Sequence, residues 1–216
     1  MIVTIDGPAG AGKSSAARGL ARRLGYRFLD TGSLYRAVTL AGVRQQVDWD
    51  DAEALARITK RLTLVLSDDR VLMDGEDVTQ EIRSFEITTL TRHAADNQEV
   101  RRQLIDLQRQ LADGVDVVTE GRDQATVAFP EAECKIFLTA GEEVRARRRH
   151  ADLRARGEPM TLEEVLQKQR QRDLRDQDRE FGGLTKSDAS IEVWTDNLTP
   201  KQVVDRLEQI VRSHQP

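Results

Sequence analysis

The chain has 216 residues, of which 38% are hydrophobic and 32% charged, and this predicts a soluble globular protein with one substantial core. A net charge of −4 argues against a protein that binds nucleic acid, and no apolar run approaches the length of a membrane span. The single cysteine, Cys134, excludes an intrachain disulfide and is expected in the core, and the three histidines lack metal-ligand spacing. We therefore expect a cytoplasmic protein without a nucleic-acid or membrane partner.

A phosphate-binding motif follows the first predicted strand. Residues 2–5 form an apolar run, residues 14–24 have a helical pattern, and Gly7-Pro8-Ala9-Gly10-Ala11-Gly12-Lys13-Ser14 between them fits G-x-x-x-x-G-K-[ST]. Glycines let the backbone N–H groups face one point at the positive end of the helix. We predict that Lys13 reaches the β- and γ-phosphates of a nucleotide and that Ser14 ligates Mg²⁺. The alternative, a turn that binds nothing, needs a chance match of roughly one in a hundred.

A second loop follows the next predicted strand, residues 26–29. It reads Asp30-Thr31-Gly32-Ser33, and Ser33 is predicted to cap a helix with Arg36 in its first turn. Because open α/β sheets build their sites at the carboxyl ends of strands, Arg36 is expected close to this loop.

Residues 62–78 have short alternating runs and turn signals in place of a helical pattern. After a predicted helix over residues 50–61, turn signals at Asp68-Asp69 and Asp74-Gly75 separate three short runs, at 62–66, 71–73 and 76–78. This pattern predicts a small antiparallel sheet inserted in an α/β protein, and such a lobe could move against the core.

The remaining elements alternate. We predict helices over 86–111 (broken near Asp96-Asn97), 142–156, 161–177 (capped by Thr161-x-x-Glu164) and 200–211, and strands over 115–118, 135–140 and 191–194. The alternation predicts a three-layer α/β fold with a central parallel sheet. Charged loops after Asp6, Leu29 and Glu120 would then converge on one edge of that sheet.

An arginine-rich segment is the second informative stretch. On a helix, Arg172, Asp176 and Arg179 would share one face at i, i+4 and i+7. A solvated helix with ion pairs remains an alternative, both here and for residues 145–149. However, 27 arginines against six lysines suit the recognition of phosphates. Because an acceptor that is itself a phosphate needs no general base, the lack of an evident activated nucleophile is consistent with direct transfer between two phosphate-bearing substrates.

Over nearly its full length the chain resembles the bacterial cytidylate kinases, of the nucleoside monophosphate kinase group of P-loop proteins. The resemblance is carried, in order, by IDGPAGAGKSS at 5–15, LDTGSLYRAV at 29–38, DGEDVTQEIR at 74–83, VR at 100–101, EGRD at 120–123, TVAFPEAECKIFLTA at 126–140, RARRR at 145–149 and RDLRDQDR at 172–179. It implies a (d)CMP kinase that transfers the γ-phosphate of ATP, with Mg²⁺, to CMP or dCMP, giving CDP or dCDP plus ADP.

The resemblance also implies roles for particular residues. ATP would be bound by Gly7, Pro8, Ala9, Gly10, Ala11, Gly12, Lys13, Ser14, Ser15 and Arg148. The catalytic set would be Lys13 together with the phosphate-holding Arg36, Arg122, Arg172 and Arg179. Thr31 and Asp176 would lie near the acceptor nucleotide, Asp176 accepting from its ribose hydroxyls, and Arg101 and Asp123 would read the cytosine edge. Ser14 would ligate Mg²⁺, and Glu120 would either anchor the magnesium shell or simply order the loop.

We expect one kinase domain over residues 1–216, with an acceptor-binding insert at about 48–92, a lid at about 150–182, and a monomeric state. Arg92 stands where relatives usually have a serine, so a kinase of a modified cytidine nucleotide or another small acceptor remains an alternative. A nucleotide-dependent switch is a more distant one. Residues 185–188 match T-K-x-D, but Gly182-Gly183 precedes them instead of a buried strand, and the chain contains no D-x-x-G.

Overall fold

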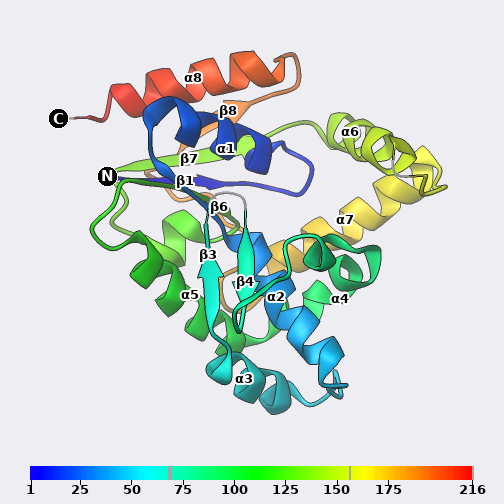
Figure 1. Cartoon of the computed structure of the whole chain (residues 1–216). Coiled ribbons are helices and arrows are strands. Elements are labelled where there is room, and N and C mark those ends of the chain that lie inside the picture. The colour runs from blue at the N-terminus through cyan, green and yellow to red at the C-terminus, as the bar shows by residue number, and fades with distance from the viewer. Residues whose placement is uncertain (68–69, 156, 216) are drawn as a thin grey trace. The chain divides into compact units, whose positions relative to one another are not determined.

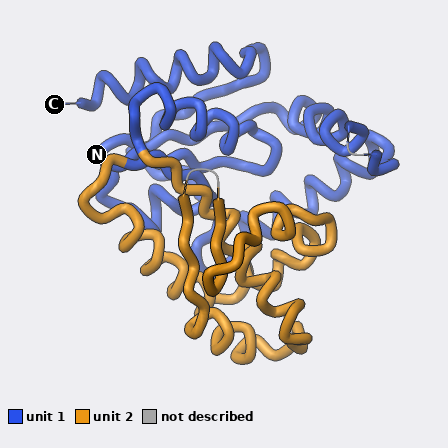
Figure 2. The backbone as a smooth tube through the Cα atoms, in the orientation of Figure 1, with its two compact units in different colours: residues 1–26, 117–216 blue, residues 27–116 orange. Residues whose placement is uncertain are grey.

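The computed structural model describes residues 1–67, 70–155 and 157–215, so the turn predicted at Asp68-Asp69 lies outside the described residues. The chain divides into two compact units (Figure 2). Unit 1 comprises Met1–Tyr26 and Val117–Pro216, and unit 2 comprises Arg27–Asp116. Each unit is described by itself.

Unit 1 contains parallel strands in the order β6-β1-β7-β8 (Figure 1). Their bounds are β1 (Ile2–Asp6), β6 (Val117–Gly121), β7 (Cys134–Thr139) and β8 (Ile191–Trp194). In register, Asp6 lies opposite Gly121 of β6 and Phe137 of β7. The carboxyl ends of β1 and β6 therefore meet at one edge, which brings the loops after Asp6 and after Gly121 together.

Two helix pairs complete unit 1 (Figure 1). Helix α1 (Lys13–Leu24) packs on α8 (Pro200–Arg212), and α6 (Glu142–Ala155) packs on α7 (Leu162–Asp178). A small core of Ala146, Leu153 and Val165 joins α6 to α7. The capping box predicted at Thr161 and Glu164 is present and starts α7. Cys134 is fully buried, as predicted.

Unit 2 is the helical part that carries the inserted sheet. Its elements are β2 (Arg27–Asp30), α2 (Thr31–Arg44), α3 (Ala52–Arg61), β3 (Leu64–Leu66), β4 (Val71–Met73), β5 (Glu76–Asp77), η1 (Glu81–Arg83), α4 (Phe85–Asp96) and α5 (Gln98–Ala112). Strands β3, β4 and β5 pair antiparallel, which confirms the predicted insert. Leu64, Leu66, Val71 and Met73 turn one face of this sheet inward.

Two local predictions are wrong. Ser33 does not cap α2: the helix begins at Thr31, and Asp30 is its N-cap, accepting from the Ser33 backbone N–H at 3.0 Å. Because the Asp30 carboxylate already caps the first turn, the helix starts at Thr31, and Ser33 lies inside that turn as a donor of its backbone N–H. The strand predicted over 115–118 is instead Val117–Gly121, so Glu120 belongs to the strand, and a π-helix, η2 (Gln124–Ala128), follows it.

The predicted fold class is confirmed: an α/β fold with a central parallel sheet, helices and a small inserted antiparallel sheet. The lid expected at about 150–182 stays a prediction. Among the described residues, no helix is long and apolar enough to cross a membrane.

Candidate active site

The loop between β1 and α1 can form only with glycine at particular positions. Gly7 has a φ of 150°, and a Cβ there would lie 2.0 Å from the carbonyl oxygen of Leu138 on β7. Gly12, the N-cap of α1, has a left-handed φ of 91°. These two glycines let the backbone turn tightly against the sheet and lead into the helix N-terminus, where free N–H groups attract anions.

Lys13 is held inside this loop. Its side chain is buried, and Nζ donates a hydrogen bond to the carbonyl oxygen of Pro8 at 2.9 Å. Burial and then the positive charge of Arg122 lower its pKa from 10.5 to about 7, although the Glu120 carboxylate opposes them. The negative charge of a phosphate beside Nζ would offset both the burial of Lys13 and the repulsion by Arg122. The site therefore favours the binding of an anion.

Ser14 and Glu120 form the oxygen-rich side of the loop. The Ser14 hydroxyl donates to Glu120 Oε1 at 2.7 Å, and the Glu120 side chain is buried at the end of β6. No cluster of three or more histidine, cysteine or carboxylate side chains that could hold a metal occurs among residues 1–67, 70–155 and 157–215. Hydroxyl and carboxylate oxygens are nevertheless the donors that suit Mg²⁺ when a nucleotide supplies further oxygens. The residues present therefore fit a metal that arrives with its nucleotide.

Three arginine side chains surround the carboxylate of Asp176 on α7. Arg122 Nε donates to Oδ2 at 2.8 Å and Arg179 Nη2 donates to Oδ1 at 2.9 Å, while Arg172 Nε lies 4.0 Å from Oδ2. Burial alone would raise the pKa of Asp176, but Arg122 and Arg172 lower it to about 2. The structure thus brings together all four of these predicted site residues, and one carboxylate orients the guanidinium groups.

Arg179 joins this cluster from the C-cap position of α7. Helix α7 ends at Asp178, and Arg179 has an extended backbone with φ −60° and ψ 124°. Its guanidinium nevertheless reaches Asp176 at 2.9 Å, so Arg172, Asp176 and Arg179 converge as their i, i+4 and i+7 spacing predicts. Arg172 and Asp176 do share a helix face.

Asp6 organises the loop after β6 and was missed by the sequence reasoning. Its carboxylate accepts backbone N–H groups of Gln124 at 2.9 Å and Ala125 at 2.7 Å, both in the π-helix. Burial raises its pKa to about 6, although these two hydrogen bonds oppose the rise. Asp123, immediately before the π-helix, is buried. Asp6 is the last residue of a largely apolar strand, and a carboxylate in that position is the sequence signal that could have indicated this role.

Arg148 of α6 is connected to the phosphate loop through Thr195. Its guanidinium donates to the Thr195 carbonyl oxygen at 2.6 Å and to Oγ1 at 2.9 Å, and Oγ1 donates to the carbonyl oxygen of Ala11 at 3.4 Å. Thr195, just past the end of β8, was not among the predicted site residues. The solvated-helix alternative for residues 145–149 fits Arg147, which is exposed, but not Arg145, which is buried.

In unit 2, the predicted residues lie at the start of α2. Arg36 Nη2 donates to Ser33 Oγ at 2.7 Å and lies 3.5 Å from Asp30 Oδ2. Its Nε is buried and has no hydrogen-bond partner within the part of the chain that the structure describes. Thr31, the first residue of the helix, is buried. The Arg36 guanidinium is therefore oriented while one of its N–H donors stays available.

Arg101 of α5 is also in unit 2 and is held rigidly. It is buried, Nη1 donates to the Ala95 carbonyl oxygen at 3.0 Å, and its guanidinium carbon lies 5.4 Å from the centroid of the Tyr35 ring. A cation over an aromatic face is stabilised by the ring quadrupole. The side chain can therefore present its donors in one orientation.

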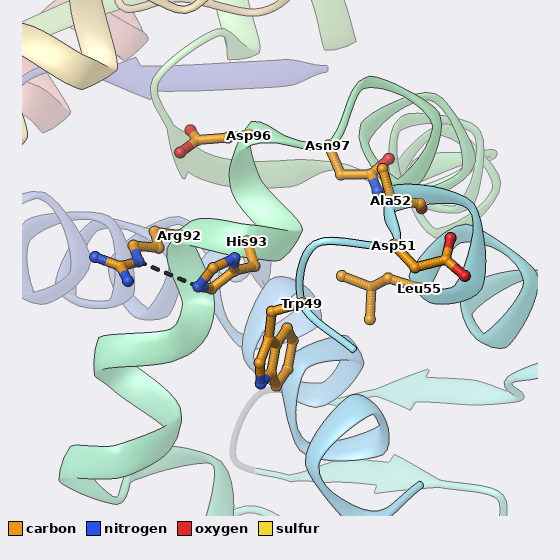
Figure 3. A pocket seen from close by; sticks show the side chains of 8 residues that line it. All are labelled: Trp49, Asp51, Ala52, Leu55, Arg92, His93, Asp96 and Asn97. Atoms are coloured by element: carbon orange, nitrogen blue, oxygen red, sulfur yellow. Dashed lines mark hydrogen bonds between the residues drawn. The ribbon is translucent and has the colours of Figure 1, made fainter. Parts of the chain in front are cut away.

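A pocket of about 270 Å³ lies in unit 2 (Figure 3), and its lining consists of Trp49, Asp51, Ala52, Leu55, Arg92, His93, Asp96 and Asn97. The Trp49 and His93 rings are stacked obliquely with centroids 5.1 Å apart, and Arg92 Nε donates to His93 Nε2 at 3.2 Å. None of the predicted site residues lines this pocket, but Arg92, which motivates the alternative acceptor, does.

Comparison with known proteins decides the family. The family model "Cytidylate kinase" matches residues 3–213. The chain belongs to the cytidylate kinase family. A cytidylate kinase of Rhodopirellula baltica is 48% identical to this family member over 98% of this chain and 93% of the relative. A cytidylate kinase of Caldanaerobacter subterraneus is 41% identical over 98% of this chain and 95% of the relative.

Solved structures agree with the fold of this cytidylate kinase family member. Shikimate kinase from Bacteroides thetaiotaomicron aligns with a TM-score of 0.52 at 14% identity, covering 98% of each chain. TT1252 from Thermus thermophilus aligns with a TM-score of 0.51 at 22% identity, covering 100% of this chain and 98% of the other. At these identities the likeness concerns the fold alone.

Proposed function

We propose that this cytidylate kinase family member transfers the γ-phosphoryl group of ATP to a phosphate oxygen of CMP or dCMP, giving ADP and CDP or dCDP. The observation that carries the proposal is the proximity of two anion sites in unit 1. Arg122, oriented by Asp176, directly follows Gly121 of β6, which lies opposite Asp6, the residue that leads into the phosphate loop. Two cationic groups of separate origin beside one phosphate cradle suit a donor and an acceptor phosphate together.

The loop from Gly7 to Ser15 is proposed as the ATP site. Its backbone N–H groups surround the β-phosphate at the N-terminus of α1, and Lys13 moves from the Pro8 carbonyl oxygen to the β- and γ-phosphates. Arg148 lies against the nucleotide next to Thr195, to which it is hydrogen-bonded.

Magnesium is proposed as the metal. The Ser14 hydroxyl would hold it directly, and Glu120, which accepts a hydrogen bond from that hydroxyl, would order its outer shell. When bound, Mg²⁺ neutralises charge on the β- and γ-phosphates.

The acceptor phosphate is proposed to bind the arginines. Arg36 has a buried Nε without a partner among the described residues, which suits a phosphate oxygen. Arg122, Arg172 and Arg179 bind acceptor and transferring phosphates, and they stabilise the negative charge of the transition state. Since the acceptor oxygen is already ionised at neutral pH, direct in-line transfer needs no general base.

The remaining acceptor contacts concern the nucleoside. Thr31 lies beside the acceptor, and Asp176 accepts from its ribose hydroxyls with lone pairs not used by the arginines. Asp123 accepts from the exocyclic amino group of cytosine, and Arg101 donates to the base carbonyl and ring nitrogen. Uracil inverts the pattern at one of these positions, which favours cytosine.

The same proposal includes the organisation of the protein. Residues 1–216 form one kinase domain. Within it, the segment at about 48–92 is the insert that binds the acceptor, and the segment at about 150–182 is a lid that excludes water. We propose a cytoplasmic monomer whose partners are nucleotides rather than nucleic acid or membrane.

An acceptor screen tests the proposal. Purified protein with ATP and Mg²⁺ is given CMP, dCMP, a modified cytidine monophosphate, UMP or AMP in parallel, and nucleoside diphosphate is quantified. We expect CMP and dCMP to be phosphorylated far faster than UMP and AMP. Rapid phosphorylation of a modified cytidine nucleotide with little CMP turnover would favour the alternative that Arg92, exposed beside Trp49 and His93, motivates.

A further inference from the structure

Arg145 of α6 is a buried cation whose contacts reach three segments of unit 1. Its Nη1 donates to the carbonyl oxygen of Ala9 in the phosphate loop at 2.9 Å, and its Nε donates to the carbonyl oxygen of Ala140 after β7 at 3.0 Å. The same Nη1 donates to Asp173 Oδ2 on α7 at 2.6 Å. Only a guanidinium has the several fixed donors that these three acceptors need.

The packing around Arg145 leaves little freedom. Its side chain is 9% exposed and that of Asp173 is 15% exposed, so solvent screens the ion pair weakly. A Cβ on Gly10 would lie 3.1 Å from the Cβ of Arg145, so the loop and α6 are in close contact. The position of the loop backbone is thereby fixed relative to α6.

Asp173 connects this contact to the arginine cluster. It follows Arg172 directly and precedes Asp176 by three residues, so one turn of α7 carries all of them. The negative charge of Asp173 also favours the charged forms of Arg122 and Arg172. Its Oδ1 is buried without a hydrogen-bond partner in the described residues, so the Arg145 contact is its anchor.

We propose that the Arg145–Asp173 ion pair is a positioning device, which sets the distance between the phosphate loop and the arginines that Asp176 holds. The proposal rests on the proposed function, because it assigns the pair to the alignment of donor and acceptor phosphates. Each half of the site keeps its own ligands when the pair is broken, but their relative placement loosens. Misplacement by about 1 Å costs on the order of 100-fold in rate while leaving the binding of each substrate largely intact.

The chain offers a matched control pair between the same two helices. Arg170 of α7 donates to Glu142 of α6, with side chains 59% and 36% exposed. Gln169 adds a hydrogen bond to the Glu142 carbonyl oxygen at 3.0 Å. Among the described residues, the side-chain hydrogen bonds of Arg170 and Gln169 to Glu142 stay between α6 and α7 and do not involve Ala9. Breaking the Arg170–Glu142 pair therefore perturbs the α6–α7 contact without affecting Ala9.

The experiment compares Arg145→Lys, Asp173→Asn, their combination and Arg170→Gln with the wild type in kcat, KM for ATP, KM for the acceptor and thermal midpoint. We expect each of the first two variants to lower kcat about tenfold to 100-fold, with both KM values within about threefold of wild type. The combination should cost no more than the larger single loss, since both variants break the same contact. Arg170→Gln should keep kcat within about twofold, because exposed pairs contribute little.

Several results would overturn the positioning role. These are an unchanged kcat in Asp173→Asn, additive losses in the combined variant, or an equal kcat loss in Arg170→Gln. A fall in kcat matched by the loss of folded protein at the assay temperature would show a structural role only. If the proposed function is wrong, the wild type itself does not phosphorylate CMP. The variants are then compared with the wild type in the reaction that it does catalyse, with another acceptor or with water.

Discussion

Asp176 accepts hydrogen bonds from Arg122 on one carboxylate oxygen and from Arg179 on the other, at 2.8 and 2.9 Å. One residue comes from the loop after β6 and the other from just beyond the end of α7, so a single carboxylate links two segments far apart in sequence. Because the pKa of Asp176 is lowered to about 2, the pair of contacts persists across the physiological pH range.

Replacing Asp176 should therefore affect the acceptor more than the donor. We expect Asp176→Ala to raise KM for CMP by about tenfold or more and to leave KM for ATP nearly unchanged, since a buried hydrogen-bonded charge partner is lost. Steady-state kinetics with each substrate varied in turn measures this. Asp178→Ala, an exposed carboxylate on the same helix, is the control. Equal damage to both KM values would indicate a structural role for Asp176.

Lys13→Ala should remove turnover while leaving the fold intact. The ammonium group stabilises charge that develops in the transition state, so we expect kcat to fall by about 100-fold to 1000-fold. Burial of Lys13 already disfavours its charged form, as its pKa of about 7 indicates, so the variant should not be less stable. Circular dichroism and the thermal midpoint check the fold. An active variant would exclude Lys13 from catalysis.

The lowered pKa of Lys13 predicts proton uptake on nucleotide binding. Near pH 7.5 a large part of the empty protein should carry a neutral lysine, and ATP phosphates should restore its charge. Calorimetry with MgATP in buffers of different ionisation enthalpy should show uptake of a fraction of a proton, and affinity should weaken as pH rises from 7.5 to 9. Lys13→Ala should show neither effect. The same pH slope in that variant would assign the proton to another group.

Asp6 predicts a pH dependence of stability with the opposite sign to that of a salt-bridged carboxylate. Its folded-state pKa is raised from 3.8 to about 6, so its contribution is favourable below about pH 4 and is lost as pH rises through about 6. Relative to Asp6→Asn, the wild type should lose about 3 kcal/mol of unfolding free energy over that range. Denaturant unfolding at pH 4, 5, 6 and 7 measures the difference. A flat difference would mean that the carboxyl group ionises normally.

The sequence predicted those parts of the site that depend on local chain chemistry. The glycine and lysine spacing of residues 7–14 indicated a loop that the structure contains, because the turn is set by backbone conformations that few residues adopt. Capping at Thr161 was predicted for the same reason, since both partners lie within one turn. At Ser33 the local pattern offered two polar candidates, and Asp30 is the cap.

Contacts between distant segments could not be predicted in the same way. Arg145 and Arg147 look alike in the run RARRR, yet one is buried against Ala9 and the other is exposed, because the packing of α6 on α7 decides which side of the helix meets the loop. Asp6 similarly meets Gln124 only because β1 and β6 are neighbours in register. Contacts of this kind depend on the order of the strands in the sheet and on how the helices pack, and the hydrophobic periodicity of the sequence does not predict either.

The central claim is that phosphate passes directly from ATP to a cytidine nucleotide. A single-turnover reaction with excess protein, Mg²⁺, γ-labelled ATP and CMP tests it most directly, with the label followed in CDP, in inorganic phosphate and on the protein. We predict that the label appears in CDP at the rate at which ATP disappears, with little in inorganic phosphate and none on the protein. Label that accumulates on the protein or in inorganic phosphate, with CMP left unchanged, would contradict the account.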